Sequence, residues 1–387
     1  MPIPIARHRL MREMNEMAVM TVIRQHGPIS RRHIAEITGL TKSTVTVAVQ
    51  RLFSKHVLKE LDSISTGPGR PERLLGLNSE AGYLLGSSID ATKCQVLLFD
   101  LQGKVLDHIA YDLKVGHAAQ DTLKLVADAA LVLLNKIPHE KYWGFGVSIP
   151  GIISAEGLVI HAPNLKWHDI AVGTFFNEWL PNPIYVVNDA QAGAIAEYYF
   201  GNALTSDLLL YLSLGMGIGG GVVMNGNLLI GAHGTGTEVG HMVISDNGPY
   251  CRCGRRGCFE AVASLRSLTE RAMRAKDVVD WLKLDQIVSA FHNHEPWARQ
   301  AVEETFYYLR EGIVNLANIF DPDTIVLGGD LSRFGEDLRA QVEVPIESDI
   351  IIANNRNLTV RLTSLDDFTS ALGAGAMALN TMVSARG

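Results

Sequence analysis

The sequence contains little cysteine and no long apolar run. Only four cysteines occur in 387 residues, and three of them fall within eight positions, which is unlike the framework of a secreted disulfide-rich protein. No stretch of about 18 residues is uninterruptedly apolar, and the N-terminus lacks an apolar segment followed by a small-residue cleavage site. These features predict a cytoplasmic protein without membrane insertion.

Charge is sparse and unevenly distributed. Charged residues make up 19% of the chain and hydrophobic residues 47%, as in a globular protein whose length predicts two or three domains. Residues 1–77 contain 12 Lys and Arg against 6 Asp and Glu, whereas the remainder contains 22 against 35. A basic head on an acidic body predicts that the head binds a polyanion, and chance asymmetry of solvated faces is the alternative.

The basic head has the pattern of three helices. The first, at about 14–25, stops before a Gly-Pro pair. Ser30 can cap a second helix that Gly39 ends, and Thr41 can cap a third that reaches about Lys55. A helix, a Thr-Gly-Leu turn and a further helix have the spacing of a helix-turn-helix.

The third helix has a packing face and a polar face. Val45, Ala48, Val49 and Leu52 recur at helical spacing and predict the packing face. An ordinary small helical domain would also show a polar face, but these side chains suit the base edges and phosphates of a major groove. The predicted DNA-binding residues of this helix are Lys42, Ser43, Thr44, Thr46, Val47, Gln50 and Arg51.

Residues 57–77, VLKELDSISTGPGRPERLLGL, alternate like two strands around a tip rich in glycine and proline. This pattern predicts a wing after the helices. Arg70 and Arg73 flank the Gly-Pro-rich tip, where an exposed arginine can enter a minor groove. We therefore expect a DNA-binding winged helix-turn-helix over residues 1–78.

The body alternates apolar strands with helical stretches, at about 190–200 and 296–320 among others. Several strands end in loops that contain glycine or aspartate, as in NPIYVVNDA and LLLYLSLGMGIGG. This alternation predicts an α/β body with sites where strands end. Cys94 stands alone in a strand and is expected to be a core thiol.

A cluster of metal ligands is the most specific signal in the body. HMVISDNGPYCRCGRRGCFE places His241, Cys251, Cys253 and Cys258 within 18 residues. Three thiolates and one imidazole form a closed tetrahedral set, which predicts structural Zn²⁺. Free cysteines packed in a core are the alternative, although the loop is polar.

Five polar residues occur near this cluster or after a strand: Asn188, Asp189, Glu238, His241 and Glu260. Each carboxylate alone would be a cap or a surface acid. A zinc loop that brought them together would form a pocket of carboxylate and amide groups, which bind a polyol through paired hydrogen bonds. We favour this pocket.

The motifs GTEVGH, CRCGRRGCFE, VVNDA and LSLGMGIGGGVV together resemble the ROK family (repressors, open reading frames and sugar kinases). The winged helix makes the chain similar to the repressor branch, the Mlc, NagC and xylose-repressor type. The resemblance implies a two-lobed, actin-like, sugar kinase-like fold after the head. We expect a smaller lobe over 79–196 plus 375–387 and a larger lobe over 197–374, which would contain the zinc site and a dimerisation surface.

The resemblance also implies functional residues. By motif, Asn164, Asn188, Asp189, Glu238, His241 and Glu260 would contact a sugar, and Asp189 matches the general base of the kinases. The phosphate-binding stretches depart from the kinase pattern. Ala91 and Thr92 replace glycines, Met216 replaces a hydroxyl residue, and Asp330 adds negative charge, so a phosphate cradle is not expected.

We therefore predict a non-enzymatic, sugar-responsive transcriptional regulator, a repressor of carbohydrate uptake or catabolism genes. Its partners would be double-stranded operator DNA, a hexose or N-acetylhexosamine effector, and a second copy in a homodimer or tetramer. Two alternatives stay open. One is an ATP-dependent sugar kinase with an accessory DNA-binding head, and the other is a regulator controlled by a protein partner.

Overall fold

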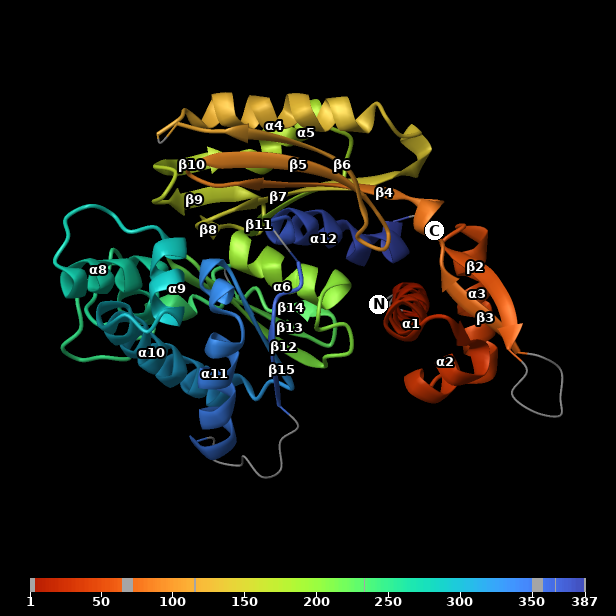
Figure 1. Cartoon of the computed structure of the whole chain (residues 1–387). Helices are drawn as coiled ribbons and strands as arrows, with labels where there is room; N and C mark the ends of the chain where they lie inside the picture. Colours follow the sequence, from red (N-terminus) through yellow and green to blue (C-terminus); the bar gives the residue numbers. More distant parts are fainter. Residues whose placement is uncertain are drawn as a thin grey trace. The chain divides into compact units, whose positions relative to one another are not determined.

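The computed structural model describes residues 4–64, 72–114, 116–232, 234–349, 358–365 and 367–385 (Figure 1). By contacts the chain divides into two compact units, which are 1–151 with 156–187 and 371–387, and 152–155 with 188–370. The first unit includes the N-terminal head. The lobe boundaries predicted from the sequence stay a prediction, and by contacts the chain passes between units at 187/188 and 370/371.

The head consists of three helices and a three-stranded sheet. Ser30 caps the second helix by accepting a hydrogen bond from His33 N, Gly39 ends that helix at φ 68°, and Thr41 caps the third. These caps are the ones that the sequence predicts. The elements are α1 (Pro4–His26), β1 (Ile29–Ser30), α2 (Arg31–Thr38), α3 (Lys42–Ser54), β2 (Leu58–Ile64) and β3 (Glu72–Leu77), with the antiparallel order β1-β3-β2.

Helix α1 begins about ten residues before the predicted start. Pro4 is tolerated in a first helical turn, and the following residues include the strong helix formers of MREMNEMA. The packing face of α3 is confirmed, because Val45, Ala48, Val49 and Leu52 are its buried residues.

The rest of the first unit is a five-stranded sheet with helices on both faces. In Figure 1, α4 and α5 lie on one face and α12 on the other. Its elements are η1 (Ser79–Ala81), β4 (Tyr83–Ile89), β5 (Lys93–Asp100), β6 (Val105–Asp112), α4 (Ala119–Leu134), η2 (His139–Lys141), β7 (Tyr142–Ile149), β9 (Leu158–Ala162), β10 (Trp167–Ala171), α5 (Val172–Trp179), β11 (Ile184–Asn188) and most of α12 (Thr369–Ala385). The short strand β8 (Ile152–Ile153) belongs to the second unit.

The second unit has a five-stranded sheet of its own. Its elements are α6 (Asp189–Phe200), β12 (Leu208–Leu214), β13 (Ile218–Met224), β14 (Asn227–Leu228), η3 (Val239–His241), α7 (Phe259–Ala263), α8 (Leu265–Lys276), α9 (Leu284–His292), α10 (Pro296–Phe320), β15 (Thr324–Gly328), η4 (Asp330–Phe334), α11 (Glu336–Asp349) and β16 (Thr359–Leu362). Helices α7 to α10 pack on one face around a large apolar core that includes Phe259, Leu309 and Ile325.

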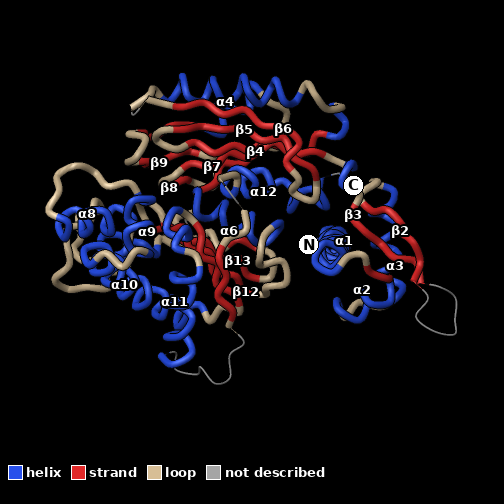
Figure 2. The backbone as a smooth tube through the Cα atoms, viewed as in Figure 1, coloured by secondary structure: helices blue, strands red, loops and turns tan. Residues whose placement is uncertain are grey.

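The two sheets, whose strands are red in Figure 2, have the same topology. Their orders are β6-β5-β4-β7-β11 and β14-β13-β12-β15-β16. In each, three antiparallel strands are followed by a helix and a fourth strand that runs parallel to the first. The predicted α/β fold class is therefore confirmed, and the structure adds that the two sheets share one topology.

Each sheet is covered by the helix that follows the last strand of the other sheet. Helix α6 follows the last strand of the first sheet, yet it packs on β12 and β13 of the second. Helix α12 follows the last strand of the second sheet but lies against the first. A Cβ on Gly146 of β7 would stand 1.8 Å from the Ala374 carbonyl oxygen, and one on Gly86 would stand 2.0 Å from that of Ala371. The helix therefore rests directly on strand backbone.

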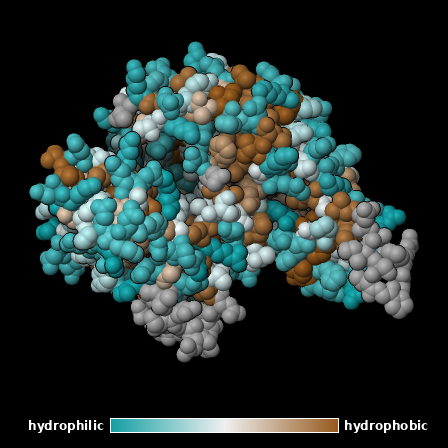
Figure 3. Space-filling view, viewed as in Figure 1, coloured by the Kyte–Doolittle hydropathy of each residue, from teal (hydrophilic) through white to brown (hydrophobic). Residues whose placement is uncertain are grey.

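Apolar side chains lie mainly inside the units. Figure 3 shows a face covered mostly by hydrophilic residues. Cys94 is 1% exposed in β5, as predicted, and burial raises the pKa of its thiol to about 11. Among the described helices, none combines the length and apolar character needed to cross a bilayer.

Candidate DNA interface, metal cluster and sugar site

The outward face of α3 offers a mixed set of polar and apolar groups. Lys42, Ser43, Thr46, Val47 and Gln50 are exposed, and Thr44 and Arg51 are half-buried. Val47 is 49% exposed, so its methyl groups can contact an apolar partner such as a thymine methyl. The structure places five of the seven predicted residues on the exposed face of this helix, with Thr44 and Arg51 half-buried at its edge, and their contact with DNA stays a prediction.

Arg51 has a structural partner that the sequence analysis missed. Its Nη1 donates to Glu16 Oε1 at 3.3 Å, and Lys55 Nζ donates to Glu16 Oε2 at 3.0 Å. Glu16 is only 4% exposed. Glu16, Val19 and Ile23 share the buried face of α1. A charged residue at an apolar position of the helical repeat was the sequence signal for a buried ion pair.

Of the two predicted wing arginines, Arg73 lies among the described residues. Arg73, on β3, forms an ion pair with Glu60 of β2, and its side chain is 61% exposed. The Arg73 guanidinium holds the pKa of the Glu60 carboxyl below its usual range. Arg70 lies outside the described residues.

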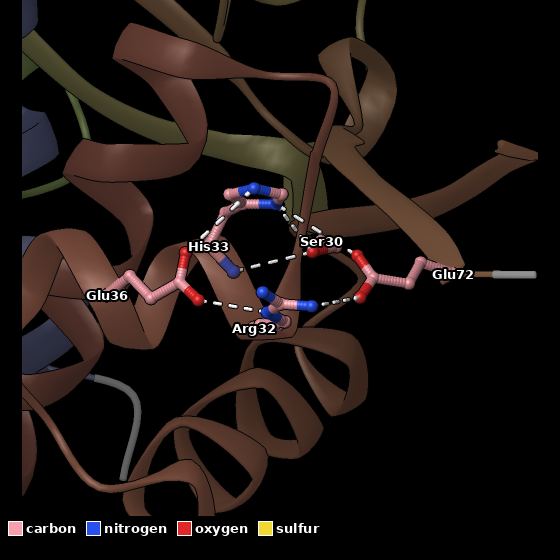
Figure 4. A network of polar contacts seen from close by, with 5 residues as sticks. All are labelled: Ser30, Arg32, His33, Glu36 and Glu72. Atoms are coloured by element: carbon pink, nitrogen blue, oxygen red, sulfur yellow. Dashed lines mark hydrogen bonds and ion pairs between the residues drawn. The ribbon is translucent and has the colours of Figure 1, made fainter. Parts of the chain in front are cut away.

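A polar network joins α2 to the wing (Figure 4). Arg32 donates to Glu36 at 2.9 Å and lies 3.9 Å from Glu72, the first residue of β3. His33 Nδ1 lies 3.1 Å from the Ser30 hydroxyl and 4.0 Å from Glu72. These contacts are exposed, so we expect them to orient α2 and β3 more than to stabilise them.

The four predicted metal ligands come together in the second unit. The ligand atoms of His241, Cys251, Cys253 and Cys258 all lie within 4.8 Å of one another. Cys251 Sγ is 3.6 Å from His241 Nδ1, and Cys253 Sγ is 3.6 Å from Cys258 Sγ. Sulfur and nitrogen atoms about 2.3 and 2.0 Å from a tetrahedral ion stand roughly 3.5–3.8 Å apart. The cluster can hold a metal ion.

The loop around the cluster suits this role. The three cysteines of the cluster are free thiols. Burial raises the pKa of Cys251 and Cys258, and a bound cation would favour their thiolate forms. Gly257 has φ 67°, and a Cβ there would stand 1.6 Å from the Ser245 carbonyl oxygen. Only glycine therefore permits the tight turn before Cys258.

Glu238, His241 and Glu260 form an electrostatic group beside the metal cluster. Burial raises the pKa of Glu238, His241 lowers it, and Glu260 raises it further. Glu260 Oε2 accepts a hydrogen bond from Ile218 N at 3.3 Å, which directs this carboxylate toward the start of β13. Glu238 is thus influenced by the charges of His241 and Glu260 within one unit, and their sharing of a sugar pocket stays a prediction.

Asn188 and Asp189 also belong to this unit, at the start of α6. Asn188 Oδ1 accepts hydrogen bonds from Ala190 N and Gln191 N at 2.9 and 3.3 Å, so Asn188 is the cap of α6, a role that the sequence analysis did not assign. Asp189 is the first helical residue. Asn164 lies in the first unit, in the turn between β9 and β10, and is exposed.

The two loops that match phosphate-binding loops of kinases are occupied by protein groups. Ala91 N donates to the Asp90 carboxylate at 2.6 Å, so this N–H is already engaged. In the second unit, a Cβ added to Gly215 would stand 3.3 Å from Asp330 Oδ2. The neighbouring Met216 is 41% exposed.

Comparison with known proteins places these features. The chain is 30% identical over 394 residues to the xylose repressor of Caldicellulosiruptor bescii, covering 98% of this chain and 99% of that protein. It is 26% identical to the DNA-binding transcriptional dual regulator NagC of Escherichia coli K12, covering 97% and 94%.

Solved structures show the same fold. A ROK family transcriptional regulator, described as a homologue of the Escherichia coli Mlc protein, has a TM-score of 0.78 at 24% identity and covers 96% of each chain. The ROK hexokinase of Thermus thermophilus has a TM-score of 0.66 at 26% identity and covers 77% of this chain and 98% of its own.

The chain joins a three-helix head to an α/β body with two related sheets, and proteins with a sugar kinase-like fold share this body. The ROK family model matches residues 85–381. The chain belongs to the ROK family, as the sequence motifs predicted.

Proposed function

We propose that this protein is a sugar-responsive transcriptional repressor of carbohydrate uptake or catabolism genes. One observation carries the proposal. The repressor relatives match the chain over nearly its whole length, including the basic head, whereas the hexokinase covers 77% of it. The shared additional part is the helix-turn-helix, and this supports DNA binding as the output.

The proposed roles follow the three sites. The head (residues 1–78) binds operator DNA through α3 and the wing, and two heads of a homodimer read two half-sites. Zn²⁺ supplies a structural cross-link when bound by His241, Cys251, Cys253 and Cys258. A sugar is bound through hydroxyl contacts to Asn164, Asn188, Asp189, Glu238, His241 and Glu260. A regulatory protein partner is the alternative signal.

We propose that the protein is not a kinase. Two features would disfavour the binding of a nucleoside triphosphate. The Ala91 N–H already donates to Asp90, and the Asp330 carboxylate near Gly215 would repel phosphate charge. Asp189, which matches the general base of kinases, would then serve only to bind a hydroxyl. A coupled assay with Mg-ATP and a sugar panel tests this, and steady turnover would instead support the kinase alternative.

The first experiment measures operator binding by fluorescence anisotropy, using DNA from around the protein's own gene. Xylose, glucose and N-acetylglucosamine are added in turn at fixed salt. We expect one sugar to change the operator affinity 5- to 150-fold, because coupling between two sites is typically about 1–3 kcal/mol. DNA binding without any sugar effect would favour a protein partner, and the absence of specific DNA binding would reject the repressor.

Replacing Glu238 by glutamine is expected to weaken sugar binding roughly 5- to 15-fold. A hydrogen bond to a charged group is worth about 1.5–3 kcal/mol and a neutral one about 0.5–1.5 kcal/mol, so glutamine, which keeps an acceptor oxygen but removes the charge, loses about 1–1.5 kcal/mol. Isothermal titration calorimetry with the effector sugar measures the change.

The matched control is Glu270→Gln, an exposed residue of α8 in the same unit. Metal content is measured in parallel, because Glu238 lies three residues before His241. Wild-type sugar affinity in Glu238→Gln with normal metal content would exclude Glu238 from the sugar site.

A further inference from the structure

A hollow of about 270 Å³ lies between α1 and α3 of the head. It is lined by Arg12, Asn15 and Glu16 from α1 and by Ser43, Thr44, Val47, Ala48 and Arg51 from α3. Four of the α3 residues were predicted to bind DNA, but none of the α1 residues was. Helix α1 therefore shares a cavity with the predicted DNA-reading helix.

The hollow lies along one flank of α3. Successive residues are rotated by about 100° in a helix, so Ser43 and Val47 belong to the outward face while Thr44 and Arg51 lie toward α1. The exposed side chains of Ser43 and Val47 thus form one wall of the hollow and part of the predicted DNA face. A duplex seated on α3 would pass over its opening.

Basic and hydroxyl side chains border the hollow. Arg51, which lines it, pairs with the buried Glu16 carboxylate, and Lys55 pairs with the same carboxylate. Arg12 lines the hollow from the α1 side and is exposed. The Ser43 and Thr44 hydroxyls of the lining lie 2.9 and 2.8 Å from the Thr41 hydroxyl. Side chains of these kinds suit an anion.

We propose that Arg12, assisted by the Asn15 amide, binds a phosphate of the operator backbone at this hollow. A guanidinium, an amide and hydroxyl groups are the donors that proteins use for DNA phosphates, and such contacts position the protein on the duplex without reading sequence. Helix α1 is then part of the DNA interface. This inference rests on the proposed DNA-binding function.

The test compares full-length Arg12→Ala, Arg12→Lys and Arg299→Ala by anisotropy between 50 and 200 mM salt. Arg299 is an exposed arginine of α10 paired with Glu303, so its loss changes the net charge equally. Losing one phosphate contact makes the slope of log affinity against log salt concentration shallower by about 0.9. Over this fourfold range of salt, the wild-type affinity should therefore fall about 3.5-fold more than that of Arg12→Ala for each head. Arg12→Lys should restore most of the slope.

The outcomes separate the inference from the proposed function. Wild-type protein that fails to bind operator DNA rejects the proposed function itself. Operator binding by Arg12→Ala with an unchanged affinity and salt slope overturns the Arg12 assignment alone. A loss confined to particular operator sequences would also overturn it, because a phosphate contact weakens binding to all sequences alike.

Discussion

Removing the metal from the cluster of one histidine and three cysteines is expected to lower the melting temperature by roughly 10 °C and to weaken sugar binding. An ion present at 1,000 times its Kd stabilises the native state by about 4 kcal/mol, and each kcal/mol is worth about 2–4 °C in a domain of this size. His241 links the cluster to Glu238 and Glu260, so its release also disturbs the proposed sugar pocket.

Cys258→Ser and chelator treatment provide two independent routes to this state. Calorimetry gives the melting temperature, and elemental analysis gives the metal content. Cys94→Ser is the matched control, since Cys94 is another buried thiol but lies in β5 of the other unit. It should lose some stability while keeping its metal. A Cys258→Ser protein with normal metal content would show that the cluster is not the metal site.

Gly146→Ala is expected to destabilise the first unit by at least about 4 kcal/mol, which lowers its melting temperature by roughly 10 °C or more. The added Cβ would stand 1.8 Å from the Ala374 carbonyl oxygen and 2.2 Å from its carbon. Since both atoms belong to the backbone of α12, no side-chain rotation relieves the overlap, and α12 must move off the sheet.

Thermal unfolding followed by circular dichroism measures this change. The control is Ala110→Val, which also enlarges a strand residue but on the exposed face of β6. Its melting temperature should stay within about 2 °C of wild type, because surface substitutions rarely exceed about 0.5 kcal/mol. An equally mild effect of Gly146→Ala would mean that α12 does not rest on β7.

The parts of the fold that depend on neighbouring residues were predictable. Ser30, Gly39 and Thr41 mark helix ends through hydrogen bonds within a few residues, and each occupies its expected position. The four metal ligands could be recognised because they lie within 18 residues and their side chains have a definite coordination chemistry. The structure brings them together, as that spacing suggested.

Features that depend on distant contacts could not be predicted in the same way. Glu16 meets Arg51 across 35 residues, and only tertiary packing decides which cation a buried acid pairs with. Asn188 was assigned to the sugar pocket from its motif, whereas its cap hydrogen bonds require the exact start of α6. Helices α6 and α12 each cover the sheet that they do not directly follow. No local sequence pattern reveals which sheet each helix covers, because both are simply rich in small apolar residues.

That arrangement has a consequence for synthesis on the ribosome. Strand β7 ends at Ile149 and the helix that covers it begins at Thr369. At a synthesis rate of about 5–20 residues per second, α12 emerges roughly 10–45 s after β7. The helices and strands described in the head pack mainly on one another. A nascent chain would therefore display a folded head, the proposed DNA-binding part, long before the proposed sensor is complete. A chaperone that shields the uncovered sheet would protect the chain during this interval.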